Sequence, residues 1–124
     1  MGSEQTKYVV ITPVRNEEEY IDFTLQSMTA QTIVPLEWII VNDGSTDRTA
    51  EIIDSYAALM PWIKHAQRKD RGFRKSGGGV IEAFYDGYEV LSKDEWHYIV
   101  KLDGDLSFKR DYFEKCFERF IENN

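Results

Sequence analysis

Cysteine is almost absent from this sequence, which contains one, Cys116, among its 124 residues. A single thiol excludes an internal disulfide framework, and such low cysteine usage fits a reducing compartment. Cys116 lies between Phe113 and Phe117 in an apolar pattern of helical spacing. We therefore expect it to be a small core residue and not a nucleophile, because a buried thiol behaves as a small apolar side chain.

Long apolar runs and excess positive charge are also missing. No run approaches the roughly 20 apolar residues that span a bilayer, and residues 1–5 lack the charged and apolar regions of a signal peptide. The 15 Lys and Arg residues against 22 Asp and Glu residues give a net charge of -7, which argues against nucleic-acid binding. We expect a cytoplasmic protein, located at the cytoplasmic face of a membrane if its full-length form is membrane-associated. The sequence leaves that association open.

The chain is organised around a stretch that begins with residues 38–41. These residues are apolar and rich in β-branched side chains, which predicts a strand covered on both faces. Gly44 then permits a sharp turn, and Ser45, Thr46 or Asp47 can each cap the helix that follows. That helix is indicated by apolar residues at helical spacing, namely Ile52, Ile53, Tyr56, Leu59 and Met60.

The other segments alternate between strand and helix patterns. Further strands are predicted over 8–12, 62–66 and 97–102, and further helices over 17–28, 80–91 and 112–121. Pro13 should end the first strand because it cannot donate to a sheet, and Asn16 is a good N-cap for the helix after it. In the third helix, Ala83 and Gly87 are small enough to lie close to the sheet. The order is that of an α/β domain with a mainly parallel sheet flanked by helices.

Polar clusters follow the predicted strands and should meet at one edge of the sheet, because crossovers of one hand bring the strand ends together there. Asp103 and Asp105 flank a glycine after the fourth strand. This pattern is often a plain turn, but two carboxylates with open positions suit Mg²⁺ or Mn²⁺ shared with phosphates. The stretch after the third strand contains five basic side chains and one acid, which favours an anion site. Asp43, with Asn16 and Glu17, can accept hydrogen bonds from a nucleobase or a ribose. The set describes a nucleoside diphosphate bound through a divalent cation.

Three motifs resemble the nucleotide-binding half of family 2 glycosyltransferases. They run over 10–18, 41–47 and 101–105, come in that family's order, and extend the likeness over nearly the whole chain. The resemblance implies a Rossmann-like glycosyltransferase-A fold that binds a nucleotide-sugar with Mg²⁺ or Mn²⁺. A UDP-sugar is favoured and a GDP-sugar is the other option. It further implies inverting transfer of the sugar to a hydroxyl of a saccharide or lipid acceptor.

The site residues implied by the resemblance are those that match the family's motifs. Asp43 would contact the nucleobase, Asp103 would approach the ribose or sugar, and Asp105 is the expected metal ligand. Arg71 and Lys75 fall in the loop that meets the donor, although Arg-Lys-Ser-Gly-Gly-Gly departs from the family's commoner Ala-Arg-Asn-x-Gly. The full set predicted for the nucleotide-sugar is Thr12, Pro13, Arg15, Asn16, Glu17, Asp43, Ser45, Arg71, Lys75, Asp103 and Gly104, and the predicted metal ligands are Asp105 and Asp103.

The resemblance also implies an acceptor-binding half that carries the catalytic base, an Asp or Glu. No candidate stands out in residues 106–124, because Glu114, Glu118 and Glu122 fit the solvated face of a helix. We therefore expect the base to lie beyond residue 124. Residues 1–6 are expected to be a disordered or expression-derived tail, and residues 7–124 to be the nucleotide-sugar-binding domain, with the acceptor half absent.

Two alternative functions remain open. A non-catalytic module that binds a nucleotide and a metal fits a chain without an acceptor half. A nucleotidyltransferase-like domain would share the fold and the metal chemistry. The turn formed by residues 42–45 favours sugar transfer over nucleotidyl transfer.

Overall fold

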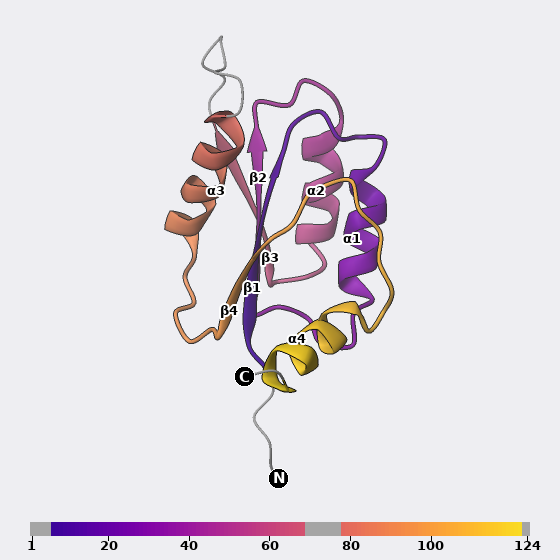
Figure 1. Ribbon diagram of the computed structural model, residues 1–124. Helices are drawn as coiled ribbons and strands as arrows, with labels where there is room; N and C mark the ends of the chain where they lie inside the picture. Colours follow the sequence, from indigo (N-terminus) through magenta and orange to yellow (C-terminus); the bar gives the residue numbers. More distant parts are fainter. Residues whose placement is uncertain (1–5, 69–77, 123–124) are drawn as a thin grey trace.

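The computed structural model of the protein describes residues 6–68 and 78–122 (Figure 1). Strands and helices alternate along them in the order β1 Tyr8–Val14, α1 Ile21–Thr29, β2 Glu37–Asp43, α2 Thr49–Ala57, β3 Ile63–Arg68, α3 Gly78–Val90, β4 Tyr98–Lys101 and α4 Tyr112–Glu122. The strands pair in parallel in the order β3-β2-β1-β4. The predicted α/β fold with a parallel sheet flanked by helices is confirmed.

The central strands β1 and β2 are buried on both faces of the sheet. One face lies against α1, α2 and α4 and buries, among others, Tyr8, Val10, Trp38 and Ile40. The opposite face lies against α3 and buries Ile11, Ile39 and Val41 together with Ala83 of the helix. Figure 1 shows the resulting layers, with α1 and α2 on one side of the sheet and α3 on the other. Burial on both faces explains why these two strands are continuous apolar runs in the sequence.

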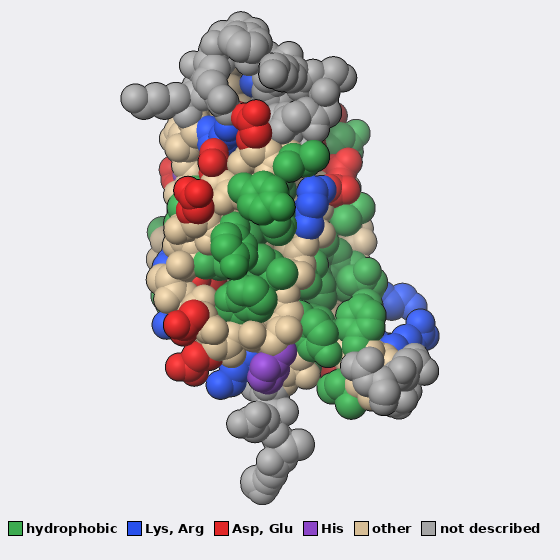
Figure 2. Space-filling view, turned by 60° about the vertical axis from the view of Figure 1, so that its left-hand side comes forward, with side chains coloured by type: hydrophobic (Ala, Val, Ile, Leu, Met, Phe, Trp, Pro, Cys, Tyr) green, Lys and Arg blue, Asp and Glu red, His purple; other side chains and the backbone are tan. Residues whose placement is uncertain are grey.

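Gly87 allows α3 to lie directly on the sheet. A Cβ atom at this position would come within 2.7 Å of Ile11 Cγ2 and 2.8 Å of Val41 Cγ2, so a larger residue would push the helix away. The predicted close approach of this helix is therefore confirmed. The outer side of α3 is also apolar, and apolar side chains gather on the face shown in Figure 2. Those of α3 that are between 47% and 60% exposed are Ile81, Tyr85 and Tyr88.

The first strand is longer than predicted, because β1 continues through Pro13 to Val14. Strand β4 pairs with β1 only as far as Ile11. The Leu102 N–H donates to the Ile11 carbonyl at 3.1 Å, so the backbone groups of Pro13, two residues on, point to the same side. They lie past the end of β4, where a missing N–H costs the sheet no hydrogen bond.

The first helix is shorter than predicted, since α1 begins at Ile21, and Asn16 is not its N-cap. Asn16 has a φ of 53°, and its Oδ1 accepts a hydrogen bond from the Thr46 N–H in the loop after β2, at 2.8 Å. The Ile21 N–H donates to the Glu17 carbonyl at 2.8 Å, within a turn that precedes the helix. The Asn16 side chain, which the local sequence predicts to cap the helix, instead forms a hydrogen bond with a distant loop.

Helix α4 closes one end of the core. The rings of Phe113 and Phe117 pack on Tyr8, with ring centroids 5.1 Å and 4.9 Å away. Cys116 lies between these residues on the helix but is only half-buried, so the expectation that it belongs to the core is wrong. Across the described residues, no helix has both the length and the apolar character that crossing a bilayer requires.

Candidate functional site

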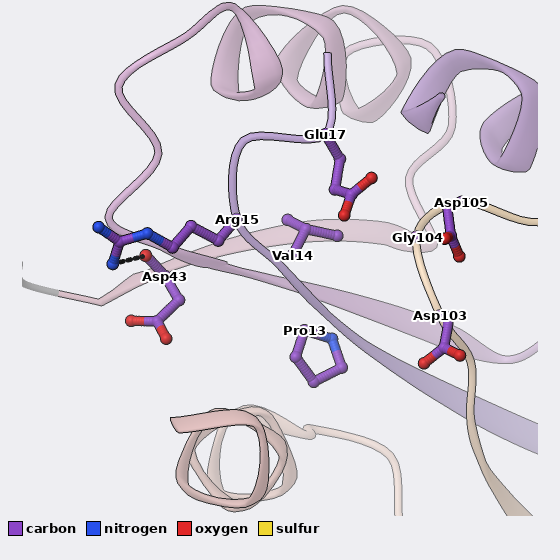
Figure 3. A pocket seen from close by; sticks show the side chains of 8 residues that line it. All are labelled: Pro13, Val14, Arg15, Glu17, Asp43, Asp103, Gly104 and Asp105. Atoms are coloured by element: carbon purple, nitrogen blue, oxygen red, sulfur yellow. Dashed lines mark hydrogen bonds between the residues drawn. The ribbon is translucent and has the colours of Figure 1, made fainter. Parts of the chain in front are cut away.

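The candidate site lies where the direction of the chain across the sheet reverses. From β1 the chain moves to β2 and β3 on one side, and α3 then returns it to β4 on the other side of β1. Ligands of open α/β sheets bind outside the carboxyl ends of the strands at such a point. A cavity of about 260 Å³ occurs there (Figure 3), lined by Pro13, Val14, Arg15, Glu17, Asp43, Asp103, Gly104 and Asp105.

Three strand ends supply this lining. The β1 end and the loop after it contribute residues 13–17, β2 contributes Asp43, and the loop after β4 contributes residues 103–105. Figure 3 shows Asp43 at one side of the cavity and Asp103 and Asp105 at the other, with the Pro13 ring between them. Seven residues predicted for the site are therefore brought together around one cavity.

Three other predicted residues lie outside the cavity lining and hold the scaffold. Thr12 is fully buried, and its hydroxyl accepts a hydrogen bond from Trp38 Nε1 at 2.8 Å. The Asn16 N–H donates to Ser45 Oγ at 2.9 Å, and Asn16 Oδ1 accepts from the loop that carries Ser45. The loops after β1 and β2 are thus joined by reciprocal hydrogen bonds. The remaining two predicted residues, Arg71 and Lys75, lie outside the described residues.

The turn after β2 is built so that Asp43 ends the strand at the cavity. Gly44 has a φ of 73°, a conformation that favours glycine. The Asn42 side chain accepts a hydrogen bond from the Ser45 N–H at 3.1 Å, which closes the turn. On the other side, Arg15 Nη1 donates to the Asp43 carbonyl at 3.4 Å. The backbone of Asp43 is therefore held from both sides.

The loop after β4 lies close to β1 because its middle residue is glycine. A Cβ atom on Gly104 would come within 2.5 Å of Val14 Cγ1 and 3.4 Å of Ile21 Cδ1. The two flanking acids, Asp103 and Asp105, are exposed to the solvent, and Lys101 Nζ donates to Asp103 Oδ1 at 3.3 Å. The close contact at Gly104 thus brings two carboxylates against the end of β1.

Negative charge accumulates in this part of the cavity. Burial raises the pKa of the Glu17 carboxyl group above its ordinary value, and the nearby charges of Asp105, Asp47 and Asp103 raise it further. Carboxylates that repel one another in this way are relieved by a cation between them. The cavity is therefore electrostatically suited to a positively charged ligand or metal ion.

The donor set of Asp103 and Asp105 fits Mg²⁺ or Mn²⁺ that is shared with a substrate. Hard cations prefer carboxylate oxygens, and Mg²⁺ is commonly held by one or two carboxylates together with substrate phosphates. Among the described residues, no group of three or more His, Cys, Asp or Glu side chains forms a complete metal cage. The arrangement therefore suits a metal that arrives with its phosphates better than a permanently bound one.

Arg68 is a site residue whose position the sequence did not reveal. It is the last residue of β3, and its Nη1 lies 3.3 Å from Asp43 Oδ2. Its other nitrogens contact two acids of α3, Glu82 at 3.2 Å and Asp86 at 2.5 Å. In the sequence, Arg68 is only the first of several basic residues. The spacing of Glu82 and Asp86, four residues apart on one helix face, is the signal that could have indicated a buried cation.

The fold and the cavity together define a Rossmann-like α/β domain with an acidic loop over residues 103–105 at the ligand edge of its sheet. Comparison with known proteins identifies its class. Residues 9–124 match the Glycosyl transferase family 2 domain, and the chain belongs to that family. Among curated relatives, Glycosyltransferase GlyA of Streptococcus pneumoniae is 29% identical over 94% of this chain and 15% of its own length. The first four curated relatives are matched over between 10% and 42% of their length.

Solved structures show that the fold is glycosyltransferase-A. TarS 1–349 of S. aureus, in complex with UDP-GlcNAc, superposes with a TM-score of 0.70 at 25% identity, over 94% of this chain and 32% of that one. The mannosyltransferase PcManGT of Pyrobaculum calidifontis, in complex with GDP-Man and Mn²⁺, has a TM-score of 0.67 at 20% identity. The latter match covers 86% of this chain and 29% of PcManGT. The expected family and fold are both confirmed.

Proposed function

We propose that this chain is the donor-binding domain of a glycosyltransferase and binds a nucleoside-diphosphate sugar together with Mg²⁺ or Mn²⁺. The observation that carries this proposal is the placement of Asp43 and the Asp103–Asp105 pair at opposite sides of one cavity at the switch point of the sheet. A nucleobase needs hydrogen-bond acceptors, whereas a diphosphate needs positive charge. Asp43 supplies a hydrogen-bond acceptor at one end, and a metal ion held by Asp103 and Asp105 would supply the positive charge at the other.

Each lining residue has a role in this proposal. The Asp43 carboxylate accepts a hydrogen bond from a nucleobase N–H, and the Pro13 ring lies where the nucleoside would pack. Glu17, on the loop after β1, lines the same cavity and would accept a hydrogen bond from a ribose hydroxyl. Asp105, with Asp103, would hold the metal ion. When bound, that ion neutralises the diphosphate and stabilises it as a leaving group.

The reaction that follows donor binding is proposed to be inverting transfer to an acceptor hydroxyl, which a carboxylate base would deprotonate. The two acids of α4 that follow the acidic loop, Glu114 and Glu118, do not line the cavity. Glu114 accepts a hydrogen bond from Thr32 Oγ1, and Glu118 lies on the exposed face of α4. We expect the base and the acceptor site, for a saccharide or lipid, in a segment additional to this domain.

A second candidate is a module that binds the nucleotide without turnover. It rests on the same cavity, whose carboxylates would hold a nucleotide and a metal ion whether or not a sugar is transferred. Both candidates predict donor binding, and they differ in catalysis. Release of free sugar or transfer to an added acceptor, measured with a UDP-sugar and Mn²⁺, would favour the enzyme. Binding without turnover would favour the module.

The binding function is tested by calorimetric titration of UDP and GDP with and without Mn²⁺. We expect Mn²⁺ to tighten the binding of the wild type. Asp105→Asn should abolish that effect of Mn²⁺, whereas Asp43→Asn should weaken nucleotide binding about 10-fold or more, both with and without metal, because a charge-assisted hydrogen bond is lost. Asp94→Asn, an exposed acid outside the cavity, is the matched control and should bind like the wild type. A folded wild type that binds neither nucleotide would contradict the proposal.

A further inference from the structure

We propose that Arg68 is a positioning residue that orients the Asp43 carboxylate toward the nucleobase and so makes the site selective for uracil or guanine over cytosine. This inference rests on the proposed function, because it assigns a nucleobase to Asp43. Arg68 is not among the residues that line the cavity. It acts through its contact with Asp43 and not through contact with the ligand.

The guanidinium of Arg68 is held on three sides by carboxylates. Nη1 lies 3.3 Å from Asp43 Oδ2, Nη2 lies 3.2 Å from Glu82 Oε2, and Nε lies 2.5 Å from Asp86 Oδ2. The side chains of Arg68 and Asp43 are only 10% and 12% exposed. Buried charges are costly unless they are paired, and here each is paired. The network therefore compensates the charge of the Asp43 carboxylate where little water reaches it.

The network also fixes the direction from which Arg68 approaches Asp43. Glu82 and Asp86 lie four residues apart on α3, so both carboxylates face the same side of the helix. A planar guanidinium that forms ion pairs with both of them presents its remaining nitrogen in one direction. The position of α3 is itself set by Gly87, whose surroundings leave no room for a side chain. The packing of α3 on the sheet thus sets the direction from which Arg68 meets the Asp43 carboxylate.

An ionised carboxylate selects among nucleobases by hydrogen-bond polarity. It only accepts hydrogen bonds, and its two oxygens can accept from Arg68 and from a ligand at the same time. Uracil presents one ring N–H on its pairing edge, and guanine presents a ring N–H beside an amino group. Cytosine has an amino donor on this edge, but its ring nitrogen is an acceptor, so a carboxylate aimed at the ring position meets a lone pair where uracil and guanine present an N–H. A site that bonds a ligand N–H strongly rejects an analogue that lacks it.

The experiment compares the wild type with Arg68→Met, a variant of similar side-chain length without charge. Titrations use three ligands with Mn²⁺ present: UDP, CDP and inorganic pyrophosphate, which has no nucleobase. In Arg68→Met we expect UDP affinity to fall about 10- to 100-fold, while CDP affinity falls much less. The UDP-to-CDP ratio should therefore decrease. Pyrophosphate affinity should not change, because the metal end of the cavity is untouched. A general loss of structure would weaken all three ligands equally.

Two further variants keep the test decisive. Arg68→Lys retains the charge but not the three-sided fork, so it should restore part of the UDP-to-CDP ratio. The double variant Glu82→Gln/Asp86→Asn changes side chains that are about half exposed and keeps Arg68 itself. It should lower the same ratio several-fold while the protein stays folded. If thermal unfolding shows that Arg68→Met does not fold, this double variant tests the role of Arg68 in its place.

The results separate this inference from the function on which it rests. A wild type that binds neither UDP nor pyrophosphate would refute donor binding, and the inference with it. A wild type that prefers UDP, with an unchanged preference in folded Arg68→Met or in the double variant, would refute the role of Arg68 alone. A wild type that binds pyrophosphate but does not distinguish UDP from CDP would likewise overturn the selectivity and leave the metal end of the site intact.

Discussion

Replacing Gly104 by alanine is the most direct test of how the acidic loop is built. The added Cβ atom would come within 2.5 Å of Val14 Cγ1 and 3.4 Å of Ile21 Cδ1, whereas ordinary carbon contacts begin near 3.5 Å. Val14 is 4% exposed and Ile21 is fully buried, so neither can move into solvent. The loop must therefore shift away from β1, and Asp103 and Asp105 would move with it.

The size of the effect follows from the cost of overpacking. Inserting a methyl group into a filled site costs about 1–3 kcal/mol. For a domain of this size, 1 kcal/mol lowers the midpoint of thermal unfolding by roughly 3–5 °C. We therefore expect Gly104→Ala to unfold about 3–15 °C below the wild type. Because the two carboxylates are displaced, the increase in UDP affinity caused by Mn²⁺ should also be largely lost.

Two controls isolate the contact with Val14. Ser107→Ala introduces the same residue at an exposed position of the same loop and should leave stability and binding unchanged. Val14→Ala removes the methyl group that Gly104→Ala would strike. The double variant Val14→Ala/Gly104→Ala should therefore lose less free energy of unfolding than the two single variants lose together, by about 1 kcal/mol or more. Thermal unfolding followed by circular dichroism and calorimetric titration give the two readouts. A Gly104→Ala protein with wild-type stability and wild-type Mn²⁺ dependence would refute the reasoning.

Two further predictions concern carboxyl groups whose pKa is shifted. Burial and the neighbouring acids raise the pKa of Glu17, so ionised Glu17 lowers stability, and stability falls as pH rises through that pKa. Glu17→Gln should raise the midpoint of thermal unfolding by about 1–3 °C at pH 7. The increase should be smaller at pH 4 and smaller in the presence of Mn²⁺. A variant with a lower midpoint than the wild type at pH 7 would contradict this. Burial raises the pKa of Glu37, but hydrogen bonds from Lys64 and Ser92 outweigh it and the net pKa is lowered. Its ionised form therefore stabilises the fold. Glu37→Gln should lower the free energy of unfolding, measured by urea denaturation, by about 1–3 kcal/mol at pH 7. The difference from the wild type should become smaller below pH 4.5. A difference that does not change with pH would argue against this account.

The sequence predicted the fold well because its apolar pattern is set by burial. Strands β1 and β2 are covered on both faces, and such strands have continuous apolar runs that end abruptly in polar turns. The alternation with helices then implies parallel strands whose carboxyl ends share an edge. Asp43, Asp103 and Asp105 each follow or end a strand, so their meeting at one cavity follows from topology alone. No side-chain detail was needed for that step.

The error at the start of the first helix arose because a polar side chain had two possible partners. Asn16 is an equally good N-cap for a helix and partner for a neighbouring loop, and local sequence does not distinguish the two. The structure uses its side chain to accept from the Thr46 N–H, and its own N–H donates to Ser45. The distance between these loops depends on the register of β1 on β2. Only tertiary structure contains that information.

Arg68 shows the same limit at a charged position. A run of basic residues ordinarily indicates a solvated loop or an anion site, yet the first residue of this run ends a strand and is 10% exposed. What removes it from solvent is the pair of acids on α3, which lies in contact with the sheet because Gly87 has no side chain. The residues proposed to contact the ligand are therefore recognisable from the strand ends on which they lie. The residue that aims one of them depends on a helix more than ten positions further along the chain. Positioning residues will in general be harder to predict than binding residues, because their partners are set by packing and not by local order in the sequence.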